Sequence, residues 1–335
     1  MNYETALSRT WRHSTSSLTN AALMQREFVR YATLAASSHN TQCWQFKLEE
    51  GGISILPDWD RRTPVVDPDD HHLYVSLGCA TENLVQAAQA NGQQGLVKVT
   101  ADSAIRIHLE PTPAIASPLF EAIPQRQSTR TDYDGQPLSK DELQQLAAAV
   151  GGSVHLILLT EKPAIEQILD YVVEGSNAQI SDPAFVQELK SWIRFNDKEA
   201  MRQGDGLFAR CTGSPTAPRW LGNLLFDRLL TPQAEAEKYT RQIRSSAGIA
   251  IFVSEANQPS HWIEVGRAYQ RFALQATALG IRTAFLNQPV EVAALRSQLA
   301  KHLGIGDRRP DLVVRFGRGP EMPRSLRRPV AAVLV

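Results

Sequence analysis

Two stretches of the chain, GCATENLVQAAQANG (Gly78–Gly92) and GRAYQRFALQATALG (Gly266–Gly280), align with each other without a gap. Glycine opens and closes both stretches, and alanine recurs at the same three positions within them. Each has the length of a helix, with small residues on one side where a second helix could approach closely. Two alanine-rich helices can match by coincidence, but the equal length and the shared glycine ends favour a duplicated unit. The sequence therefore predicts two similar halves.

Strand signals surround both of these helices. In the first half, a hairpin is predicted at WQFKLEEGGISILP, and further strands at GLVKVTA and AIRIHLEP. In the second half, strands are predicted at SVHLILLT, GIAIFVS, IRTAFL, DLVVRF and PVAAVLV. Between them, PTPAIASP holds three prolines in eight residues, which forbids regular structure. We expect an N-terminal half over residues 1–120 and a C-terminal half over residues 121–335.

One segment does not fit this pattern of helices and strands. GDGLFARCTGSPTAPRWLGN (Gly204–Asn223) is rich in glycine, proline and small polar residues. It is too long for a simple connection, so we expect a lid over a site, with Trp220 as a side chain that could cover a ligand.

Composition limits the class of protein. The chain has 335 residues, of which 35 are basic and 35 acidic, so its formal net charge is zero. That balance argues against binding of nucleic acid or an anionic membrane through bulk charge. No apolar run approaches the length of a membrane-spanning helix, and no signal-peptide pattern is present. The three cysteines are widely spaced, which is typical of reduced thiols, so we expect a cytoplasmic protein.

Basic residues alternate just after the proline-rich break. In RQSTRTDYDGQPLSKDEL, residues Arg126, Ser128 and Arg130 share one side of an extended chain because strand side chains repeat with a period of two. Two guanidinium groups flanking a hydroxyl suit a phosphate, because arginine offers paired donors that match its oxygens. A solvated strand edge is the alternative.

A second basic group lies near the end of the sequence. EMPRSLRRPV supplies Arg324, Arg327 and Arg328 directly before the last apolar run. These arginines could form a solvated tail, or they could complete the same anion site if the chain folds back.

The turn SSHNTQCWQF (Ser37–Phe46) holds more hydrogen-bonding side chains than a surface loop needs. His39 and Cys43 could suggest a nucleophilic pair, but no orienting partner or GxSxG motif accompanies them. The run from Asp69 to His72 contains metal-ligand residue types. We expect a solvated turn there and no metal, because adjacent side chains point in opposite directions and no further ligand stands at useful spacing.

Together these motifs resemble the FMN-dependent nitroreductases. RQSTRTDYDGQPLSKDEL resembles the motif with which that family begins, SSHNTQCWQF resembles its SSxNxQPW loop, and the segment from EVGRAYQ to DLVVRFGRGP resembles its C-terminal half. DWDRRTPVVDPDDHHLYVSLGCATENL is similar to the Acg-type branch, in which one chain carries two nitroreductase-like units. The resemblance implies an α+β fold with antiparallel-rich sheets flanked by helices, whose two halves pack as a pseudo-dimer around one FMN.

The same resemblance implies roles for ten residues. The phosphate of FMN would be held by Arg126, Ser128, Arg327 and Arg328. Arg130 would lie beside the pyrimidine end of the ring, where a cation stabilises negative charge. Ser37, Ser38 and Asn40 would reach the ribityl chain or the ring from the first half. Asn287 and Gln288 would lie near the flavin N5. No side chain is assigned a catalytic role.

The expected activity is electron transfer from NAD(P)H to a small-molecule acceptor such as a nitro compound or quinone, by a monomeric pseudo-dimer or a homodimer. Two alternatives stay open. A flavin-binding storage or sensing protein would have the lid closed over the flavin and show no turnover. A degenerate relative would bind no flavin and act as a scaffold.

Overall fold

The computed structural model describes residues 2–14 and 20–335. Its helices are α1 (Tyr3–Thr10), α2 (Ala21–Thr33), α3 (His71–Ala90), α4 (Pro118–Ala122), α5 (Lys140–Val150), α6 (Lys162–Ile180), α7 (Pro183–Trp192), α8 (Asp197–Gln203), α9 (Arg219–Leu229), α10 (Pro232–Arg244), α11 (Pro259–Ala278), α12 (Gln288–Glu291) and α13 (Ala293–His302). Its strands are β1 (Trp44–Glu49), β2 (Gly52–Pro57), β3 (Gln93–Val99), β4 (Ile105–Pro111), β5 (His155–Leu159), β6 (Ile193–Arg194), β7 (Leu207–Phe208), β8 (Gly248–Val253), β9 (Arg282–Phe285) and β10 (Pro310–Gly317). The predicted α+β fold with antiparallel sheets is confirmed.

The two four-stranded sheets have the same topology. Their strand orders are β1-β2-β4-β3 and β5-β8-β10-β9, and every neighbouring pair within them is antiparallel. In the order of the sequence, the second strand of each sheet, β2 or β8, leads into the long helix, α3 or α11. The third strand, β3 or β9, follows that helix. If the four strands of each sheet are numbered 1 to 4 along the sequence, both sheets have the spatial order 1-2-4-3. This equivalence supports the predicted duplication.

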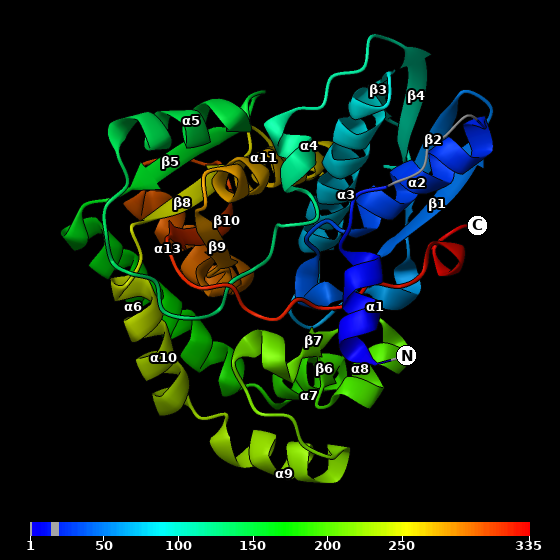
Figure 1. Ribbon diagram of the computed structural model, residues 1–335. Coiled ribbons are helices and arrows are strands. Elements are labelled where there is room, and N and C mark those ends of the chain that lie inside the picture. Colours follow the sequence, from blue (N-terminus) through cyan, green and yellow to red (C-terminus); the bar gives the residue numbers. More distant parts are fainter. Residues whose placement is uncertain (1, 15–19) are drawn as a thin grey trace.

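The helices α3 and α11 pack against each other at the centre of the molecule, with one sheet to each side (Figure 1). They cross at Gly78 and Gly266. A methyl group on Gly78 would come within 2.0 Å of the carbonyl oxygen of Ile263, and one on Gly266 within 1.9 Å of the carbonyl oxygen of Val75. Carbon and oxygen atoms that are not bonded to each other do not approach so closely, so the crossing requires glycine on both helices.

The end of the chain returns to the first half, as the red segment in Figure 1 shows. Phe46 of β1 donates its N–H to the carbonyl of Val333 at 2.7 Å and accepts from Val335 N–H at 3.0 Å. The strand predicted for PVAAVLV is wrong apart from this bridge, because Val330–Ala332 forms a 3₁₀ turn. Arg328 Nη2 donates to the carbonyl of Ala332 at 2.7 Å and occupies an acceptor that a strand would use.

A mostly helical layer separates β5 from β8 in the sequence and lies below the second sheet in Figure 1. It contains α6, α7, α8, α9 and α10 and the short parallel pair β6–β7. α9 and α10 were not predicted. α10 begins with an N-cap, Thr231, whose side chain accepts from Ala234 N–H, and with Pro232 at the first helical position. Within residues 2–14 and 20–335, no helix is both long enough and apolar enough to cross a membrane.

Candidate functional site

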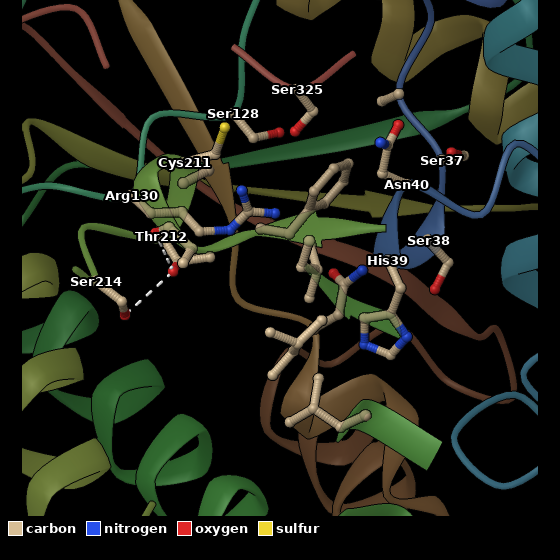
Figure 2. Close-up of a pocket in the computed structure, with 18 of the residues that line it drawn as sticks. Ser37, Ser38, His39, Asn40, Ser128, Arg130, Cys211, Thr212, Ser214 and Ser325 are labelled. Carbon is tan, nitrogen blue, oxygen red and sulfur yellow. Dashed lines mark hydrogen bonds between the residues drawn. The ribbon is translucent and has the colours of Figure 1, made fainter. Parts of the chain in front are cut away.

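A cavity of about 530 Å³ lies where the start, the middle and the end of the chain meet. Nine of the ten residues assigned from the sequence line it: Ser37, Ser38, Asn40, Arg126, Ser128, Arg130, Asn287, Gln288 and Arg327. Figure 2 shows the turn with Ser37, Ser38 and Asn40 on one side and Ser128 and Arg130 across from it. The tenth residue, Arg328, does not line the cavity.

Two guanidinium groups form one wall, that of Arg126, which is buried, and that of Arg327, which is partly buried. Both donate to carbonyls at the end of α2: Arg126 Nη2 to Leu34 at 3.3 Å, and Arg327 Nε to Thr33 at 2.8 Å. Among the described residues neither arginine has a carboxylate partner, and Arg126 Nε and Nη1 have no hydrogen-bond partner at all. Burial, followed by the charge of Arg126, lowers the pKa of Arg327 to about 9, and burial also lowers the pKa of Arg126. Two adjacent like charges, one buried and one partly buried and neither paired with an acid, are expected to bind an anion.

The segment from Arg126 to Arg130 is extended, as the sequence predicts. Ser128 forms a β-bridge with Thr283 of β9, and Thr129 N–H donates to the carbonyl of Thr283 at 2.9 Å. This pairing turns Thr129 into the core and leaves its two alternating neighbours facing the cavity. The guanidinium of Arg130 points into the cavity in Figure 2 and forms no hydrogen bond or ion pair with any described residue.

The polar turn has three non-glycine residues with a positive φ: His39 at 46°, Asn40 at 54° and Gln42 at 53°. Such strain persists where surrounding bonds fix the backbone. Asn40 Nδ2 donates to the carbonyl of Gly206 at 3.0 Å, and Gln42 Nε2 donates to the carbonyl of Gly204 at 2.9 Å. The turn therefore holds the segment that the sequence predicted as a lid, in addition to lining the cavity.

His39 lies in this polar turn and also lines the cavity. Burial, followed by the charge of Arg130, lowers the pKa of His39 to about 4, so the ring is neutral at pH 7. Its Nδ1 is buried without a partner.

Arg328 faces away from the cavity because consecutive side chains of an extended chain point in opposite directions. Its guanidinium contacts Asp58 Oδ2 at 3.2 Å, and its backbone N–H donates to Gln42 Oε1 at 2.8 Å. The sequence could not decide which of the adjacent arginines, Arg327 or Arg328, would face the site.

The predicted lid contributes to the cavity wall and extends beyond its predicted end at Asn223. Cys211, Thr212 and Ser214 face the cavity beside Arg130 (Figure 2), and α9 adds apolar side chains such as Phe226. Trp220 does not cover the cavity. Its side chain is 71% exposed and does not line it, because α9 turns the opposite face inward.

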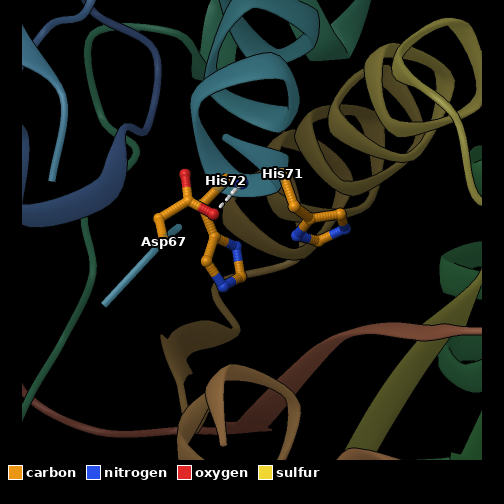
Figure 3. A group of neighbouring side chains, drawn as sticks. All are labelled: Asp67, His71 and His72. Carbon is orange, nitrogen blue, oxygen red and sulfur yellow. Dashed lines mark hydrogen bonds between the residues drawn. The ribbon is translucent and has the colours of Figure 1, made fainter. Parts of the chain in front are cut away.

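The expectation of a solvated turn from Asp69 to His72 is wrong for the two histidines, although Asp69 itself is exposed. His71 and His72 are buried in the first turn of α3, and their ring nitrogens and an Asp67 oxygen lie within 4.8 Å of one another (Figure 3). Local contacts account for this group. The two Asp67 oxygens cap the helix, each accepting a backbone N–H at 3.0 Å, and His71 Nε2 lies 2.8 Å from Asp311. Burial lowers the pKa of both histidines, and the positive charge of Arg309 adds to this effect and would oppose another cation.

Glu291 of α12 lines the cavity and was missed by sequence reasoning. Gln179 Nε2 donates to its Oε2 at 2.6 Å, and His72 Nε2 lies 3.7 Å from its Oε1. Burial raises the pKa of Glu291 to about 7, and the charge of Asp67 adds to this effect. No sequence signal could have found it, because its neighbours come from distant parts of the chain.

Comparison with known proteins gives one family. The family model described as "Nitroreductase family" matches residues 123–318, more than half of the chain. Two proteins from strains of Mycobacterium tuberculosis, provisionally named NAD(P)H nitroreductases, are each 26% identical over 326 residues, covering 92% of this chain and 90% of theirs.

Solved structures of nitroreductases are similar over part of the chain. A Bacteroides fragilis nitroreductase with bound FMN is 17% identical with a TM-score of 0.38, covering 63% of this chain and 94% of that one. An FMN-dependent nitroreductase of Mycobacterium smegmatis in complex with NADPH is 12% identical with a TM-score of 0.39, covering 62% and 94%.

Proposed function

Because this chain belongs to the nitroreductase family, we propose that it binds FMN in the cavity and transfers electrons from NAD(P)H to a small-molecule acceptor. The observation that carries the proposal is a pair of guanidinium groups, the buried one of Arg126 and the partly buried one of Arg327, which lack an acidic partner among the described residues. A phosphate monoester supplies the missing negative charge and accepts several hydrogen bonds at once.

Unpaired polar atoms around the cavity fit a ligand of this kind. Buried atoms without a partner that belong to its lining residues are Arg126 Nε and Nη1, Arg324 Nε, His39 Nδ1, Asn40 Oδ1, Gln127 Nε2 and Gln288 Oε1. Donors predominate near the arginines, and acceptors occur on Asn40 and Gln288. FMN has a phosphate, a hydroxylated chain and a ring edge with both donors and acceptors, so it can satisfy such a set.

When bound, FMN would supply the two-electron redox chemistry, and the protein would position it. Arg126, Arg327 and Ser128 would hold the phosphate. Arg130 would place a positive charge beside the ring, and Asn287 and Gln288 would lie near the ring in the same half of the chain. Ser37, Ser38 and Asn40 would reach the ribityl chain or the ring from the other half.

The nitro compound or quinone acceptor and the NAD(P)H donor are inferred from the names of the relatives and from the family. The two sheets of equal topology support a single chain acting as a pseudo-dimer. Its three buried free cysteines are consistent with a cytoplasmic location.

A flavin-storing or flavin-sensing protein is the second candidate, and the position of the lid favours it. The segment after Gly204 is held against the polar turn by Asn40 and Gln42, and Thr212 and Ser214 lie over the cavity beside Arg130. If this segment stays closed, no nicotinamide can reach the ring. Turnover of NADH or NADPH with a nitro compound or quinone separates the two functions.

The visible spectrum of the purified protein with added FMN tests the proposal. We expect flavin bands that survive gel filtration in the wild type and are lost in Arg126→Ala and in Arg327→Ala. Arg328→Ala is the matched control and should keep them, because Arg328 faces Asp58 and not the cavity. Retention of the bands in both cavity variants would refute the assignment.

A further inference from the structure

One wall of the cavity carries a carboxyl group that pairs with no lysine or arginine among residues 2–14 and 20–335. Glu291 of α12 is 16% exposed and lines the cavity together with Gln179 of α6, Tyr239 of α10 and His72 of α3. Gln179 fixes Oε2 through its hydrogen bond of 2.6 Å, which leaves Oε1 beside the His72 ring at 3.7 Å.

The groups that face Glu291 keep its proton in place. His72 is neutral at pH 7 because burial, followed by the charge of Arg309, lowers its pKa to about 3. Burial raises the pKa of Tyr239, so the phenol is neutral as well. Asp67 contributes negative charge, which disfavours a second carboxylate.

The nearby cations are engaged elsewhere. Lys238 of α10 pairs with Glu235, and Arg296 of α13 donates to the carbonyl of Val290 at 3.0 Å. With its pKa raised by burial to about 7, Glu291 carries a proton at pH 6 and in about half of the molecules at pH 7, and its side chain lines the cavity.

We propose that Glu291 is the catalytic acid that protonates a nitro acceptor during its reduction. This inference rests on the proposed function. The residue is held on a helix that directly follows Asn287, and Gln288 of the same helix carries an unpaired Oε1 at the cavity.

The reaction needs such a proton. Reduction of a nitro group to a nitroso group takes two electrons and breaks one N–O bond, and the released oxygen leaves as water. A reduced nicotinamide supplies a hydride equivalent, which is two electrons and one proton. Glu291 supplies the second proton from its carboxyl group, and solvent returns a proton to Glu291 before the next turnover.

Two acceptors separate proton transfer from electron transfer. A nitroaromatic acceptor needs the proton, whereas ferricyanide takes electrons and no proton. In the FMN-loaded Glu291→Gln variant, we expect nitroaromatic reduction at pH 6 to fall by about 100-fold, with ferricyanide reduction within twofold of wild type. The wild-type rate with the nitroaromatic should decline as pH rises through 7, and the variant should lack this decline.

An infrared measurement gives a readout that does not depend on activity. At pH 6 the difference spectrum between the wild type and Glu291→Gln should contain the stretching band of one protonated carboxyl. Asp67 and Asp311, whose pKa values burial also raises, contribute to the same spectral region in both proteins and cancel in the difference. Glu166→Gln, which removes an exposed carboxylate paired with Arg244, is the control and should change neither the band nor the rates.

Three results would overturn the inference. An unchanged nitroaromatic rate and pH profile in Glu291→Gln, with an active wild type, would remove the role of Glu291 and leave the proposed function intact. An equal loss with both acceptors would show a structural role only. A flavin-loaded wild type that reduces neither acceptor would contradict the proposed function itself, and the inference with it.

Discussion

Gly78 and Gly266 lie at the crossing of α3 and α11, and each packs against the carbonyl oxygen of the residue three positions before the other. A methyl group on Gly78 would also lie 3.0 Å from the Cα of Gly266. This reciprocal contact is the pattern of a two-fold symmetric interface, here formed within one chain. The helix crossing thus lies at the same residues that first suggest two units in the sequence.

Alanine at either glycine should separate the helices. We expect Gly78→Ala and Gly266→Ala each to lower the free energy of unfolding by about 3 kcal/mol, measured by urea denaturation. The double variant should lose less than the sum, because both methyl groups open the same contact. Gln275→Ala, at a partly exposed position of α11, should change stability little. Additive losses would contradict the shared contact.

The unpaired charge of Arg126 should reduce the stability of the ligand-free protein. Without FMN, the free energy of unfolding of Arg126→Met should exceed that of the wild type by about 1–4 kcal/mol, because replacing a buried charge by an apolar side chain removes its desolvation cost. The variant should therefore unfold at a higher urea concentration. With FMN the order should reverse, since only the wild type gains from binding. A ligand-free wild type that is more stable than the variant would show that the α2 carbonyls already satisfy Arg126.

The raised pKa of Glu291 predicts how stability depends on pH. The folded protein holds this proton more tightly than the unfolded chain, so the contribution is complete below pH 4.5 and is lost as pH rises through about 7. Glu291→Gln cannot ionise. Between pH 5 and pH 8 it should therefore gain stability relative to the wild type, by up to about 3 kcal/mol. Equal pH dependence of the two proteins in urea denaturation would contradict the buried acid.

The side chain of Gln42 should hold the segment after Gly204 in place. Its amide donates to the carbonyl of Gly204 and accepts from Arg328 N–H, so Gln42→Ala removes both ties. We expect faster hydrogen exchange in residues 204–218 and in the residues around Arg328, with the two central sheets unchanged. If the lid blocks access to the flavin, this variant should also oxidise NADPH faster than the wild type. Unchanged exchange would mean that other contacts hold the segment.

The sequence predicted those features that depend on local geometry. The alternation of Arg126, Ser128 and Arg130 implied a shared face, and pairing with β9 keeps that segment extended. The matched glycines implied a close helix crossing, which the structure contains.

Features that depend on distant neighbours could not be predicted. α10 is strongly charged, so no apolar pattern marked it, and its start depends on a local cap at Thr231. His72 and Glu291 come together only through tertiary packing. Arg327 and Arg328 are chemically identical, and only the path of the tail decides that Arg327 faces the cavity and Arg328 faces Asp58.

The presence of two sheets of equal topology in one chain changes what selection can do to the site. In a homodimer, every substitution appears on both sides of the symmetry axis, so the two walls of a shared pocket cannot be tuned separately. Here the turn from Ser37 to Gln42 and the arginine wall are encoded once each, at different positions. The residues of each wall can therefore change independently. The segment after Gly204 can also change in one half of the chain without a corresponding change in the other.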